Sequence, residues 1–135
     1  MPVIHSVDSP TFTFTVPGVD SRPGVPHLTV RGLAAPSRGS TQTCVWRMTV
    51  APATPPRMGT VDHEEIFHVL TGRATVTLDG AQHQLSPGDT LVVPPEVTFG
   101  IGNPHDAPVE FVVVFPVGGR ARAPGMEPFV PPWAE

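Results

Sequence analysis

The stretch EIFHVLTGRATVTLDGAQHQLSPGDTLVV, residues 65–93, decides the fold class of this chain. It contains short runs, rich in Val and Thr, in which polar and apolar residues alternate, and such runs predict β-strands. These runs lie at residues 65–70, 74–78, 81–85 and 90–93. The Asp79-Gly80 step favours a two-residue hairpin, because both residues tolerate the positive φ of a type I′ turn. We therefore expect consecutive antiparallel strands here.

The rest of the chain follows the same pattern, since 19 prolines and 13 glycines divide it into short segments. Further candidate strands lie at residues 11–16, 27–33, 41–50, 97–101 and 109–115. Many short strands predict an all-β barrel or sandwich. No window combines a sustained helical period with capping residues, so we expect little helix.

The composition limits the binding partners and the cellular compartment that we expect for this protein. A chain of 135 residues fits one domain, and a net charge of −4 with eight scattered arginines offers no basic stripe for nucleic acid. We expect no membrane partner, because no apolar run approaches the roughly 20 residues of a membrane span. The absence of a signal-peptide pattern and the single Cys44 predict a cytoplasmic protein.

Two segments resemble the two sequence motifs of the cupin superfamily. In GTVDHEEIFHVLTG, residues 59–72, Glu65 and Gly72 are separated by six residues, as in the first motif. In GDTLVVPPEVTFGIGN, residues 88–103, Gly88, Pro94 and Asn103 match the second. The resemblance, to small bacterial stand-alone cupins, covers roughly residues 41–116. It implies a double-stranded β-helix, the cupin jelly-roll barrel, with a central ligand cavity.

The metal-binding histidines of those motifs are absent. Gly59 and Val61 occupy the two histidine positions of the first motif, and Phe99 occupies that of the second. Of the four cupin metal ligands only Glu65 remains, and a lone carboxylate does not hold a transition ion against water. We expect no metal and no cofactor.

Strand parity predicts which side chains face the cavity. Counting by twos from Glu65, which points inward by the resemblance, places His63 and Phe67 on the same face. Trp46 and Met48 share one face of the strand at residues 41–50. The candidate ligand-binding residues are Trp46, Met48, Gly59, Val61, Phe67, Phe99 and Asn103.

Three functions are compatible with this site. The leading interpretation is a protein that binds a small organic molecule in a largely apolar cavity without the usual metal. The second is a metal-independent cyclase or isomerase of an aromatic or polyketide-like metabolite. Burial of Glu65 would raise its pKa, so that it acts as general acid or base, with His63 as a second candidate. The third is a metalloenzyme with shifted ligands, in which His63, Glu65 and another histidine as the third ligand bind the ion. The candidates for that third ligand are His5, His27, His68, His83 and His105.

The two ends of the chain carry separate expectations. Residues 1–40 contain N-terminal strands, and the alternating FTFTV of residues 12–16 predicts an exposed edge that a homodimer would cover. Residues 41–116 form the barrel core. Residues 117–135 form a proline-rich tail whose Phe129 and Trp133 favour packing on the barrel or on a neighbouring subunit, with a floppy terminus as the alternative.

Overall fold

The computed structural model describes residues 2–16, 19 and 24–135. The described residues are almost entirely β-structure, with three short 3₁₀ turns and no α-helix. The strands are β1 (Thr11–Phe14), β2 (Leu28–Ala34), β3 (Thr43–Val50), β4 (Thr60–Val61), β5 (Glu65–Thr71), β6 (Ala74–Leu78), β7 (Ala81–Leu85), β8 (Thr90–Val93), β9 (Phe99–Gly102), β10 (Val109–Pro116) and β11 (Ala121–Arg122). The predictions of an all-β fold and of little helix are confirmed.

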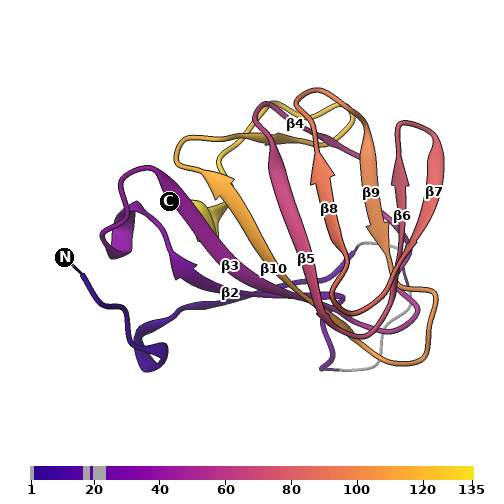
Figure 1. The fold of residues 1–135 in the computed structure, drawn as a ribbon, viewed down its shortest axis with the longest axis horizontal. Helices are drawn as coiled ribbons and strands as arrows, with labels where there is room; N and C mark the ends of the chain where they lie inside the picture. The colour runs from indigo at the N-terminus through magenta and orange to yellow at the C-terminus, as the bar shows by residue number, and fades with distance from the viewer. Residues whose placement is uncertain (1, 17–18, 20–23) are drawn as a thin grey trace.

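The strands form a jelly roll of antiparallel sheets. The largest sheet has the order β1-β2-β3-β10-β5-β8, a second has the order β7-β6-β9, and β4 pairs with β11. Figure 1 shows β2, β3, β10, β5 and β8 side by side, β9, β6 and β7 beyond them, and β4 across one end of the barrel. This is the double-stranded β-helix that the two motifs predict.

The hydrophobic core lies where the inward faces of these sheets meet. In β10 every second residue is buried, and Val109, Phe111, Val113 and Phe115 are each at most 1% exposed. This period-2 burial is what a strand with one face on the core requires. The alternation in β5 buries Glu65, Phe67 and Val69 in the same way, so one carboxyl group enters the barrel interior.

The observed strands agree closely with the predicted ones, except that two observed strands, β4 and β11, have no predicted counterpart. The hairpin at Asp79 and Gly80 has φ angles of 49° and 80°, as the Asp-Gly step predicts. The strands β4 and β11 were not predicted, because two residues are too few to show a period. Among the described residues, the helical segments are all too short to cross a membrane.

The C-terminal tail packs on the barrel. Ala121 and Phe129 exchange two backbone hydrogen bonds of 2.8 and 2.9 Å, which fold the tail back on β11. The Trp133 ring packs edge-on against Phe12 at 6.0 Å, and the carbonyl of Ala134 accepts a hydrogen bond from Cys44 Sγ at 3.5 Å. The structure therefore supports the expectation that the tail packs on the barrel and not the alternative of a floppy terminus.

Candidate functional site

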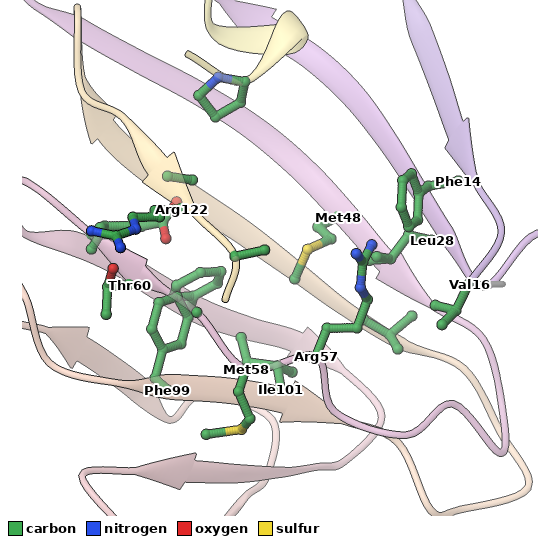
Figure 2. Close-up of a pocket in the computed structure, with 18 of the residues that line it drawn as sticks. Phe14, Val16, Leu28, Met48, Arg57, Met58, Thr60, Phe99, Ile101 and Arg122 are labelled. Carbon is green, nitrogen blue, oxygen red and sulfur yellow. The ribbon is translucent and has the colours of Figure 1, made fainter. Parts of the chain in front are cut away.

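A cavity of about 340 Å³ opens inside the barrel. This volume lies at the lower end of the range of about 300–1,000 Å³ that is typical of small-molecule sites. The walls come from β3, β4, β5, β9, residues 54–59 and the C-terminal tail. The central lining residues are Trp46, Met48, Gly59, Val61, Glu65, Phe67, Phe99, Ile101, Arg122, Phe129 and Trp133. Figure 2 shows Met48, Phe99 and Ile101 in the middle of this space.

Among the residues that the structure describes, Glu65 is the only acidic side chain that lines the cavity. It begins β5, pairs with Val93 of β8 and is only 6% exposed. Within the described residues its carboxyl group makes no hydrogen bond or ion pair. Burial disfavours the charged form and raises the pKa of Glu65 to about 8. At neutral pH the group is therefore mostly protonated and able to donate a hydrogen bond.

The walls around Glu65 are aromatic and aliphatic. Phe67, two residues along β5, packs against Phe99 at 5.8 Å and against Phe111 at 6.1 Å between ring centroids. Phe99 thus fills the position where the second cupin motif has a histidine. Apolar side chains in place of imidazoles keep the cavity floor hydrophobic, and this is the environment that holds the carboxyl group neutral.

The structure brings most of the sequence-predicted site residues together. Glu65 shares the cavity with Trp46, Met48, Gly59, Val61, Phe67 and Phe99. Two predicted residues lie elsewhere, His63 and Asn103.

The prediction that His63 faces the cavity is wrong. Residues 62–64 form a bend between β4 and β5, so the alternation of β5 does not extend back to His63. The imidazole is 56% exposed and donates to Asp62 Oδ1 at 2.8 Å. Burial raises the pKa of Asp62, but hydrogen bonds from the Arg120 backbone N–H and from His63 outweigh it and hold that pKa below its ordinary value. His63 belongs to a surface turn.

Asn103 is fully buried but does not line the cavity. Its Nδ2 donates to the carbonyl oxygens of Val50 at 3.1 Å and Ala107 at 2.8 Å. Its Oδ1 accepts from the backbone N–H of His105 at 3.0 Å. These bonds tie the loop after β9 to the end of β3, which is a structural role.

The residues present do not fit the metal that the cupin motifs usually hold. Val61 and Phe99 have no donor atom, and a Cβ atom at Gly59 would lie 2.7 Å from the carbonyl oxygen of Arg122. Among the described residues no three His, Cys, Asp or Glu side chains come together as a metal site. His68, a candidate for a shifted site, hydrogen-bonds Thr90 Oγ1 at 2.8 Å instead.

Several cavity residues were not predicted from the sequence. Arg57 and Met58 follow a run of prolines, and Thr60 and Arg122 face each other in the short β4–β11 pair. The Arg57 guanidinium lies 4.7 Å from the centre of the Phe14 ring at one end of the cavity (Figure 2). Nothing in the local sequence marks these positions. The tail residues Phe129 and Trp133 differ from these, because their large aromatic side chains predict packing on the barrel.

A family model described as Cupin domain matches residues 46–115, which is 70 of the 135 residues. The chain belongs to the cupin family. The match includes Glu65 and Phe99 and spans the strands β3 to β10 that enclose most of the cavity.

Solved structures show the same fold. The polyketide cyclase RemF from Streptomyces resistomycificus superposes with a TM-score of 0.72 at 21% identity, over 94% of this chain and 87% of that one. A cupin-2 domain protein from Rhodospirillum rubrum has a TM-score of 0.66 at 15% identity, over 91% and 75% of the two chains. Salicylate 1,2-dioxygenase from Pseudoaminobacter salicylatoxidans has a TM-score of 0.63 at 16% identity, over 76% of this chain and 30% of that one.

One curated relative matches in sequence. An uncharacterised protein of Methanocaldococcus jannaschii is 35% identical over 49 residues, which are 36% of this chain and 39% of that protein. The match therefore spans well under half of the relative.

Proposed function

We propose that this cupin binds a small, largely apolar organic molecule in its barrel cavity, without the metal that the family motifs usually hold. One observation carries the proposal: the buried carboxyl group of Glu65, which has no partner among the described residues, lines a cavity whose other walls are mostly aromatic and aliphatic. Sites of this kind, apolar with few polar groups, are typical of small-molecule binding.

The protonated carboxyl group selects the ligand. A buried donor without a partner costs about 1–3 kcal/mol, so a ligand oxygen that accepts its hydrogen bond removes this cost. The aromatic rings of Phe67 and Phe99 suit a flat ring system. The ligand should therefore combine a ring body with a carbonyl or hydroxyl oxygen directed at Glu65.

Acid–base catalysis is the second candidate function, favoured by the pKa of about 8 at Glu65. A group that titrates near neutral pH transfers protons well in both directions. Ionised Glu65 could take a proton from a carbon next to a ligand carbonyl and return it at another position, as in an isomerisation. RemF, which shares the fold, is a polyketide cyclase. His63 cannot act as the second group, since it lies in the surface turn.

Native mass spectrometry of the freshly purified protein tests the proposal. We expect the mass of the chain plus an organic ligand and no stoichiometric transition metal. Met48→Trp, which fills the cavity from β3, should remove the ligand while the protein stays folded by circular dichroism. A transition metal near one per chain, or an organic ligand retained by a folded Met48→Trp variant, would refute binding in this cavity.

Glu65 substitutions separate binding from catalysis. Glu65→Gln keeps the shape and a hydrogen-bond donor, so it should keep the ligand but lose any turnover. Glu65→Leu, which has no hydrogen-bond donor, should lose both ligand binding and any turnover. Glu64→Gln, which changes the exposed neighbour, is the matched control. If Glu65→Gln turned a substrate over at the wild-type rate, Glu65 would have no role in proton transfer.

A further inference from the structure

Among the described residues two arginines, Arg57 and Arg122, line the largely apolar cavity. Figure 2 shows them at opposite ends of the site, with Arg122 beside Thr60 and Arg57 beside Phe14. Glu65, the one acidic group of the described lining, is mostly protonated at neutral pH because burial raises its pKa to about 8. The described part of the cavity lining thus carries two positive charges and no full negative charge, although the whole chain has a net charge of −4.

The two guanidinium groups differ in what they contact. Arg57 lies over the Phe14 ring at 4.7 Å, a cation–π contact that occupies one of its faces. Arg122 is exposed, and its side chain makes no hydrogen bond, ion pair or ring contact with any other described residue. Its donors are therefore free for a ligand, and the planar fork of an arginine matches the two oxygens of a carboxylate.

The backbone of Arg122 is held at the cavity, although the residue itself is exposed. Arg122 pairs with Thr60 across the β4–β11 ladder, and both residues line the site. The tail folds back on β11 through the Ala121 and Phe129 hydrogen bonds, which fixes the backbone that carries Arg122. A cation held by a short strand at the edge of an apolar cavity is placed to meet the charged end of an amphipathic ligand.

We propose that the ligand is an aromatic carboxylic acid, whose carboxylate pairs with Arg122 beside Thr60 and whose ring system lies in the apolar cavity. This inference rests on the proposed function and adds the chemical class of the ligand. The neutral Glu65 then contacts the ring end of the molecule through an oxygen substituent, and the charged end stays near solvent, where its desolvation costs least.

A matched pair of probes tests the inference. The probes are 2-naphthoate and 2-naphthamide, which share one ring system and differ in charge, with affinities measured by isothermal titration calorimetry at low salt. In the wild type we expect 2-naphthoate to bind about tenfold more tightly, as a charge-assisted hydrogen bond predicts. Arg122→Gln should bring 2-naphthoate down to the affinity of 2-naphthamide and leave 2-naphthamide unchanged.

Arg120→Gln is the matched control, because it removes the same charge two residues away at a position that does not line the cavity. It should leave both affinities within about twofold of the wild type, and Arg122→Lys should retain part of the preference. Equal wild-type affinities for the two probes, or an equal loss in Arg120→Gln, would overturn the inference and leave the cavity function standing. Binding of neither probe at millimolar concentration would overturn the proposed cavity function itself.

Discussion

The indole ring of Trp133 packs edge-on against Trp46, with ring centroids 6.1 Å apart and an angle of 63° between the planes. Trp46 belongs to β3 in the middle of the large sheet, whereas Trp133 is third from the end of the chain. Both rings line the cavity. The proline-rich tail is therefore part of the cavity wall, and its packing links the stability of the barrel to the shape of the site.

Replacing Trp133 tests this link. Trp133→Ala removes the contacts with Trp46 and Phe12, and we expect it to lower the free energy of unfolding by about 2 kcal/mol. It should also weaken 2-naphthamide binding. Urea denaturation and calorimetry measure the two effects. Met126→Ala, in the same tail but 52% exposed, should cost less than half as much. A Trp133→Ala protein as stable as the wild type would show that the tail does not pack in solution.

The pKa of Glu65 predicts a pH dependence of stability. Its ordinary value of 4.5 applies to the unfolded chain, and in the folded chain the pKa rises to about 8. Between these values the folded state binds more protons, so the free energy of unfolding falls as the pH rises. Glu65→Gln should remove this fall. Above pH 4.5 the free energy of unfolding of Glu65→Gln should therefore rise relative to that of the wild type, by at most about 1.4 kcal/mol per pH unit. This difference should level off above pH 8.

Urea denaturation from pH 4 to pH 9 measures this difference. Glu64→Gln is the control, because it removes a carboxylate at the neighbouring exposed position and should follow the wild-type profile. If Glu65→Gln were less stable than the wild type at pH 8, the carboxylate would be stabilised in the folded protein. The neutral hydrogen-bond donor that we assign to Glu65 would then be wrong.

The barrel was predictable from sequence because strand parity and the motif spacing are local signals. Parity placed Phe67 correctly on the face of Glu65, but it failed at His63, where a bend interrupts the strand. The position of Arg122 had no local signal, because β11 is a strand only by pairing with β4. Asn103 matches its motif, but its hydrogen bonds hold the backbone together outside the cavity. A residue at a motif position can therefore serve the fold and not the ligand site.

Asn103 should matter for stability and not for binding. Asn103→Leu removes the donor to the carbonyl oxygens of Val50, in a buried bond, and of Ala107, in a partly buried one. We expect a loss of about 3 kcal/mol in the free energy of unfolding. Gln82→Leu, on the exposed strand β7, should change it by less than about 0.5 kcal/mol. Below its unfolding transition the Asn103→Leu protein should bind 2-naphthamide normally. A stable variant that lost this binding would instead assign Asn103 to the site.

Restoring two histidines should create a metal site. Val61→His with Phe99→His adds two imidazoles to the cavity beside Glu65, and three protein ligands are sufficient for zinc. We expect about one zinc per chain after dialysis, measured by elemental analysis, and none when Glu65→Gln is added. A third change, Gly59→His, should cost about 1–3 kcal/mol of stability, since its Cβ would lie 2.7 Å from the Arg122 carbonyl oxygen. A folded double variant without zinc would show that these positions do not replace the family's ligands.

The edge strand β1 predicts a homodimer. Within the described residues β1 pairs only with β2, so one side of its backbone lacks a strand partner, and Phe14 is 39% exposed. An open edge of this kind favours pairing with a second copy. Light scattering should give about twice the chain mass of 14.3 kDa. Thr13→Lys places like charges face to face in such a pair and should shift the protein to monomer, whereas Thr13→Val should not. A wild-type monomer at 100 µM, with its first twenty residues resistant to protease, would show that β1 needs no second subunit.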